Sequence, residues 1–136
     1  MIRELSREEI DAFLASQIVG RIGCHADGLT YVVPVIYAYD GESVYVASVE
    51  GQKIRMLRQS PRVCFETDEY ERGSWRSVIA YGDYEELSGE EAERAVALLA
   101  ERFGRSGSGR RHGGEGTRTV CFRIRIREAT GRAVAR

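Results

Sequence analysis

The chain has 136 residues, of which 43% are hydrophobic and 30% charged, and its formal net charge is −1. This length and composition are typical of one soluble globular domain and exclude a largely disordered chain. A net charge near zero creates no field that would favour nucleic acid or an acidic membrane as a partner, and no apolar run reaches the ~20 residues of a membrane helix. We therefore expect a single domain over residues 1–136 that binds neither nucleic acid nor membrane.

The three cysteines are odd in number and far apart: Cys24, Cys64 and Cys121. They fall in apolar strand patterns, where a free thiol behaves as a small hydrophobic side chain. With no CxxC spacing and only two histidines, His25 and His112, the sequence gives a metal site little support. The N-terminus, Met1–Leu5, lacks the apolar core of a signal peptide, so the expected compartment is the cytoplasm.

The first third of the chain predicts one helix followed by strands. Ser6 and Glu9 have the spacing of a capping box, and the helix they begin runs to about Ser16. Residues 19–25 and 30–39 then have the composition of strands. Asp40-Gly41 is a strong turn signal that predicts a hairpin into a third strand.

The second of these strands is apolar on both faces over Tyr31–Tyr37. A strand without a polar face is covered on both sides, by the core and by a helix, a ligand or a second subunit. Pro34 has no backbone N–H to give to a neighbouring strand, so we expect it at a sheet edge or at a bulge.

A strand over Val44–Val49 leads through Gly51 into a short helix, Gln52–Gln59, which ends at Ser60-Pro61. The free N–H groups at the start of a helix and its dipole favour an anion, most naturally a phosphate. Ser48 and Lys53 would add a hydroxyl and a positive charge at the same place. The alternative is an ordinary strand–helix corner with a solvated lysine.

Further along, residues 62–67 and 74–87 predict a fourth and a long fifth strand, separated by a polar loop over Asp68–Gly73. A second helix starts near Ser88 and has its apolar residues at helical spacing up to Phe103.

The glycine-rich segment Gly104–Gly116 carries several basic residues. It is either a plain connection or a basic flap that closes on an anionic ligand.

A last strand, with alternating apolar residues, covers Val120–Arg127 and is followed by a turn over Thr130–Arg132. The sequence thus predicts six strands with short connections and, beyond the N-terminal helix, one short and one longer helix. This pattern predicts a mainly β fold, an antiparallel barrel with helices packed outside. A doubly wound parallel sheet would need a helix after nearly every strand.

Several short motifs occur in an order that resembles the pyridoxamine 5'-phosphate oxidase-like split-barrel flavoproteins, especially the branch of nitroimidazole-resistance proteins. These motifs are Val19-Gly20-Arg21-Ile22-Gly23, Val32-Val33-Pro34-Val35, Ser48 with Gly51-Gln52-Lys53, Arg62-Val63-Cys64-Phe65-Glu66, Arg76-Ser77-Val78-Ile79 and Thr130-Gly131-Arg132. The likeness is dense from Val19 to Gly82 and looser elsewhere.

The resemblance implies a homodimer of six-stranded split β-barrels that binds FMN in two grooves at the subunit interface. Position by position, Ser48 and Lys53 would hold the phosphate with help from the Gln52 backbone. Arg76 and Ser77 would contact the phosphate or the polar rim of the flavin. The residues expected along the isoalloxazine ring are Val33, Pro34 and Val35.

The implied activity is electron transfer from a reduced nicotinamide to a small-molecule substrate, or to oxygen. The nitroimidazole-resistance branch tends to have a histidine where this chain has Ala47, which argues against nitroimidazole reduction. No residue is an obvious acid or base; Tyr31, Arg76 and His112 are candidates. The alternatives are a reduced deazaflavin, FAD or haem in place of FMN, a cofactor-binding module without turnover, and an empty dimeric scaffold.

Overall fold

The structure is a computed structural model, which describes residues 1–104 and 118–134. The described strands are β1 (Ile2–Glu4), β2 (Val19–Ala26), β3 (Leu29–Ile36), β4 (Ala38–Tyr39), β5 (Ser43–Val49), β6 (Arg62–Glu71), β7 (Ser74–Glu86) and β8 (Thr119–Val134). The described helices are α1 (Arg7–Ser16), α2 (Gln52–Gln59) and α3 (Gly89–Phe103). None of these helices is long and apolar enough to cross a membrane.

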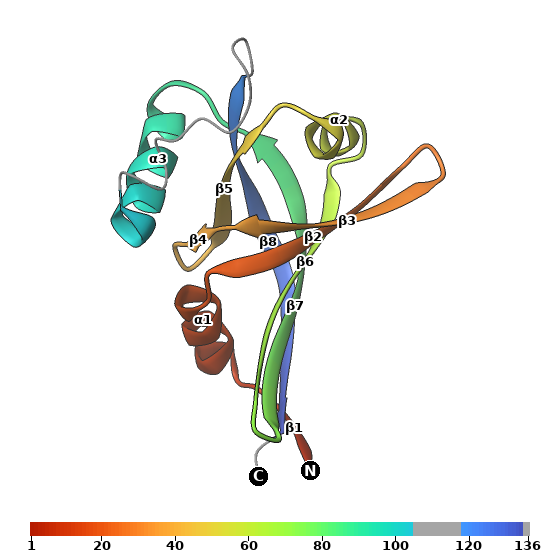
Figure 1. Cartoon of the computed structure of the whole chain (residues 1–136), viewed down its shortest axis with the longest axis vertical. Helices are drawn as coiled ribbons and strands as arrows, with labels where there is room; N and C mark the ends of the chain where they lie inside the picture. The colour runs from red at the N-terminus through yellow and green to blue at the C-terminus, as the bar shows by residue number, and fades with distance from the viewer. Residues whose placement is uncertain (105–117, 135–136) are drawn as a thin grey trace.

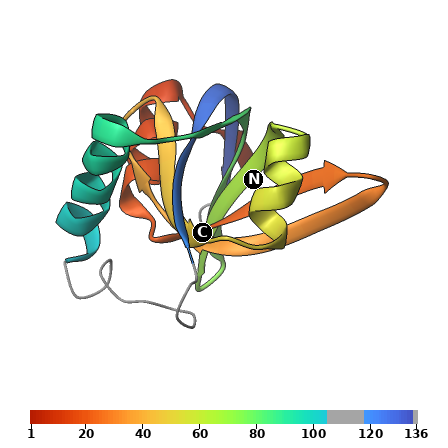
Figure 2. The same ribbon diagram turned by 90° about the horizontal axis from the view of Figure 1, so that it is seen from above.

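The described strands form one eight-stranded sheet in the order β3-β2-β6-β7-β8-β5-β4, with β1 beside β8. Every pairing is antiparallel, as the short connections predicted. Figure 1 shows the long strands β6, β7 and β8 as the spine of the molecule, and Figure 2 shows the helices around the curved sheet. The mainly β prediction is correct, but the described strands number eight, not six.

Two predicted breaks turn out to be continuous strand. The expected loop over Asp68–Gly73 is mostly β6, which pairs with β7 as far as Glu71, so that the turn is only Arg72-Gly73. Likewise β8 continues through the expected turn at Thr130–Arg132, where it pairs with β7. Gly131 serves packing there, because a Cβ on it would lie 2.8 Å from the Leu5 side chain.

The predicted strand over residues 30–39 is divided into β3 and β4 around Tyr37, whose ring turns into the core. It packs edge-on against Phe65, with 4.9 Å between ring centres.

The helix α1 has the expected capping box and buries Ile10, Phe13 and Leu14. Pro34 lies on β3, the edge strand of the sheet, as its missing N–H predicted.

The Tyr37 hydroxyl joins α1 to the core. Its side chain is 1% exposed, and the hydroxyl donates to the Leu14 carbonyl oxygen at 2.6 Å. That carbonyl belongs to the last turn of α1, where helix carbonyls lack a helical partner. Burial raises the pKa of Tyr37 to about 12.

We expect Tyr37→Phe to lower the free energy of unfolding by about 1–2 kcal/mol, because the buried carbonyl loses its donor. Urea unfolding followed by circular dichroism measures this. Tyr31→Phe is the matched control, since Tyr31 also packs against the core but its hydroxyl has no hydrogen-bond partner in the described chain. An equal effect of both substitutions would contradict the role of the Leu14 contact.

Candidate functional site

The sequence-predicted corner forms between the end of β5 and the start of α2. Ser48 is fixed by pairing with Val120 of β8, and α2 is fixed because Ile54 and Leu57 are completely buried. The helix begins after Gly51, and no side chain caps it. Its first N–H groups therefore face the corner without a side-chain acceptor.

Lys53, the only lysine of the chain, lies at this corner half-buried. Its ammonium donates to the Ser48 hydroxyl oxygen. Within the part of the chain that the structure describes, no carboxylate forms an ion pair with it. Burial lowers the pKa of Lys53, an effect opposed in part by the nearby Cys24 thiol. A half-buried ammonium without a counter-ion is suited to an anionic ligand.

The predicted ring-binding residues on β3 do not all face outward. Val35 is 8% exposed and belongs to the core, and Val33 packs against the core from its rim. Pro34 is exposed on the opposite face. Since β3 is an edge strand of the described sheet, no described strand pairs with its outer backbone edge, which offers N–H and C=O groups to a ligand.

Arg76, on β7, lies away from the β5–α2 corner. Its guanidinium is 3.2 Å from a Glu69 carboxylate oxygen and 4.6 Å from the centre of the Phe13 ring. It lines a cavity of about 190 Å³ together with Trp75. Neighbouring Ser77 points to the other face of β7, since side chains alternate along a strand.

The sheet register shows that one chain cannot bring Arg76 to Lys53. The β8 partner of Ser48 is Val120, whereas the β8 partner of Arg76 is Ala133, thirteen residues further on. At ~3.3 Å per residue, the two positions are roughly 40 Å apart along the strand. The structure therefore groups Ser48, Gln52 and Lys53, and leaves Arg76 and Ser77 far from them within the chain.

The side chains of β3, β2, β6 and β7 that point away from the core form a surface we name the outer sheet face. Its large apolar residues are Val19, Val32, Ile36, Tyr70, Ile79 and Tyr81, with exposed fractions of 44%, 64%, 55%, 73%, 39% and 51%. The second apolar face of the β3 strand, predicted to be covered, is thus uncovered within the described chain. An exposed apolar patch of this kind is typical of an interface.

The outer sheet face also carries a charged cluster that the sequence did not reveal. One guanidinium nitrogen of Arg21 is 3.0 Å from a Glu66 carboxylate oxygen and 3.1 Å from one of Asp68. Burial and the Asp68 carboxyl raise the pKa of Glu66 to about 7, against the opposing effect of Arg21. The signal in the sequence is two carboxylates at alternate positions, Glu66 and Asp68, but Asp68 falls in the segment predicted to be a loop.

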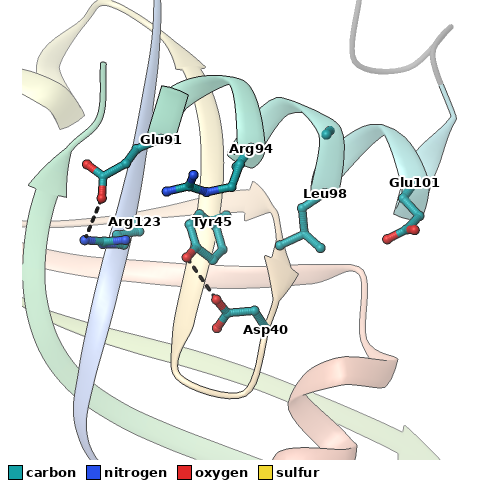
Figure 3. A pocket seen from close by; sticks show the side chains of 8 residues that line it. Asp40, Tyr45, Glu91, Arg94, Leu98, Glu101 and Arg123 are labelled. Atoms are coloured by element: carbon teal, nitrogen blue, oxygen red, sulfur yellow. Dashed lines mark hydrogen bonds and ion pairs between the residues drawn. The ribbon is translucent and has the colours of Figure 1, made fainter. Parts of the chain in front are cut away.

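A larger cavity, of about 400 Å³, lies beneath α3 (Figure 3). Tyr45 lines it and donates its hydroxyl to Asp40 at 2.9 Å, and Arg123 is 3.5 Å from Glu91. Tyr45 and Ser48 are three residues apart on β5 and point to opposite faces, so this cavity is separate from the corner. Much of its polar lining is already paired within the chain.

The family model of pyridoxamine 5'-phosphate oxidase matches residues 6–133. The chain belongs to this family. A FAD-binding protein from Mesorhizobium loti has 33% sequence identity and a TM-score of 0.81, over 100% of this chain and 98% of that one. Membership in the family and the antiparallel split-barrel fold, both expected from the motifs, are confirmed.

Two further solved structures share the fold at lower identity. A candidate 5-nitroimidazole antibiotic resistance protein from Bacteroides thetaiotaomicron has a TM-score of 0.81 at 17% identity, covering 98% of this chain and 87% of that one. The FAD-binding protein of Mycobacterium smegmatis has a TM-score of 0.70 at 20% identity, covering 99% and 100%.

A curated relative, an uncharacterised protein of Rhizobium meliloti (strain 1021), is 37% identical over 87 residues. The match spans 63% of this chain and 58% of the relative's length.

Proposed function

We propose that this family member is a flavin-dependent oxidoreductase that holds FMN through its phosphate at the β5–α2 corner. It would pass electrons from a reduced nicotinamide to a small-molecule substrate. The observation that carries the proposal is Lys53, a half-buried ammonium with no carboxylate partner in the described chain, beside an uncapped helix start.

The residues at the corner fit a phosphate group chemically. A phosphate dianion would offset the cost of burying the Lys53 ammonium and would accept hydrogen bonds from Ser48 and from the first N–H groups of α2. The flavin, when bound, supplies the hydride and electron chemistry. The chain's own task is to fix the phosphate and to offer the ring an apolar wall with free backbone groups, which the edge strand β3 has.

We place the flavin between two copies of the chain. Among the described residues the outer sheet face is largely apolar and nothing covers it, and a second copy would cover it. Arg76 and Ser77 are too far along the sheet to meet Lys53 of the same chain. A cofactor that contacts all three must therefore receive Arg76 and Ser77 from the partner copy.

The corner by itself selects a phosphate, which FMN, FAD and deazaflavin cofactors share. The Mesorhizobium loti relative is described as binding FAD. Ala47 takes the place of the histidine expected in the nitroimidazole-resistance branch, which favours a module that binds flavin without nitroimidazole turnover.

The test is the absorption spectrum of the purified protein, before and after incubation with FMN, FAD or a deazaflavin and removal of the excess. We expect an oxidised flavin band in the blue, with FMN retained best, and bleaching of that band by a reduced nicotinamide under anaerobic conditions. A flavin that no nicotinamide reduces would indicate a binding module. A haem absorption band would mean that the cofactor is haem and not a flavin. A colourless protein that retains no flavin would contradict the phosphate site.

A further inference from the structure

The charged cluster of Arg21, Glu66 and Asp68, here named the Arg21 cluster, lies within the outer sheet face. Arg21 on β2 is paired across the sheet with Pro34 on one side and with Glu66 on the other. Glu66 is in turn paired with Ile79 of β7. The cluster is therefore bordered on both sides by apolar side chains that are exposed in the chain.

Two carboxylates share one cation in this cluster. Glu66 and Asp68 both approach the same Arg21 nitrogen, so the fully ionised cluster carries a net charge of −1. The residues paired with the cluster on β3 and β7 are uncharged, namely Pro34, Ile79 and Ser77. Beyond them, Arg132 of β8 is paired with Ser77, and on β6 itself the Cys64 thiol lies two residues before Glu66 and interacts with it. One bound proton makes the cluster neutral.

We propose that docking of a second copy on the outer sheet face is coupled to protonation of the Arg21 cluster, so that the dimer forms with uptake of about one proton per chain. This inference rests on the homodimer of the proposed function and adds a regulator to it. Covering the cluster with apolar surface removes water from it, and burying a net charge costs more free energy than burying the same cluster in its neutral form.

The sign of the pH dependence follows from the proton balance. The dimer holds more protons than two separate chains, so raising the pH weakens it. Glu66 has a pKa of about 7 before docking, which places the change near neutral pH. If each chain takes up one proton, the dimer dissociation constant rises by up to about 100-fold from pH 6 to pH 8.

The test measures the dimer dissociation constant at pH 6, 7 and 8 by fluorescence-detected sedimentation of the flavin-free chain, labelled at its N-terminus. We expect the wild-type constant to rise with pH. Glu66→Gln, which keeps the shape of the side chain but has no charge to lose, should dimerise equally at all three values and more tightly than wild type at pH 8. Glu71→Gln is the control, because Glu71 lies on the same strand but at the hairpin end, away from the cluster. It should behave like wild type.

The outcomes separate this inference from the proposed function. A wild-type dimer whose constant stays within threefold between pH 6 and pH 8 overturns the proton coupling and leaves the flavin site intact. A chain that is monomeric at every pH overturns the homodimer as well. Circular dichroism at each pH establishes that the variants compared are folded.

Discussion

Lys53→Ala is expected to weaken FMN binding by between about tenfold and 100-fold. The substitution removes a charge-assisted hydrogen bond to the phosphate, worth ~1.5–3 kcal/mol, and 1.4 kcal/mol corresponds to a factor of ten. Because the native chain contains no other lysine, no second lysine side chain can take over. Quenching of flavin fluorescence on titration measures the dissociation constant. We would abandon the phosphate assignment if affinity stayed within about twofold.

Arg55→Ala is the matched control for that experiment. Arg55 lies on α2 two residues after Lys53, is exposed, and its side chain has no ion-pair or hydrogen-bond partner in the described chain. The substitution removes one positive charge from the same helix but leaves Ser48 and Lys53 of the β5–α2 corner unchanged. Binding that falls equally in both variants would mean that the general charge of α2, not the Lys53 contact, attracts the flavin.

A single lysine also permits a direct observation of the contact. Reductive methylation with ¹³C-formaldehyde labels Lys53 and the N-terminal amine alone, so one side-chain NMR signal reports on the corner. FMN should shift this signal, whereas riboflavin, which has the same ring but no phosphate, should leave it nearly in place. Equal shifts of the signal with both ligands would mean that Lys53 contacts the flavin ring and not the phosphate.

The parts of the fold that could be predicted from the sequence are those determined by neighbouring residues. The helix Gln52–Gln59 occurs where the glycine before it and the proline after it indicated, and the capping box of α1 forms as expected. The corner site follows for the same reason, since Ser48 and Lys53 are only five residues apart.

What the sequence did not reveal depends on pairing between distant strands. Polar residues suggested a loop after Thr67, but pairing with β7 extends β6 to Glu71 and brings Glu66 and Asp68 to one face. Thr130-Gly131 suggested a turn, although β8 passes straight through it. The distance between Arg76 and Lys53 likewise becomes visible only through the register of β8, because no local signal encodes it.

The role of Gly82 could likewise not be predicted from the local sequence, and we expect its substitution to have a large effect on stability. A glycine inside the predicted fifth strand gave no signal of its own, yet it stands at the irregularity where the register of β7 and β8 shifts. A Cβ at this position would lie 2.2 Å from the carbonyl oxygen of Arg125 and 3.0 Å from a methyl carbon of Ile124. The first of these atoms is backbone of the paired strand and cannot rotate away.

We therefore expect Gly82→Ala to lower the free energy of unfolding by about 3 kcal/mol, at the upper end of the usual cost of overpacking, because β7 and β8 must separate to admit the methyl group. Urea unfolding at a fixed chain concentration measures it. Gly23→Ala is the control: its Cβ would meet nothing closer than 3.8 Å, so the same loss of glycine in a strand should cost little. Equal stability of the two variants would show that the strands yield at the register shift. Since β8 also pairs with β5, such yielding would shift the backbone that holds Ser48 and change flavin affinity in Gly82→Ala alone.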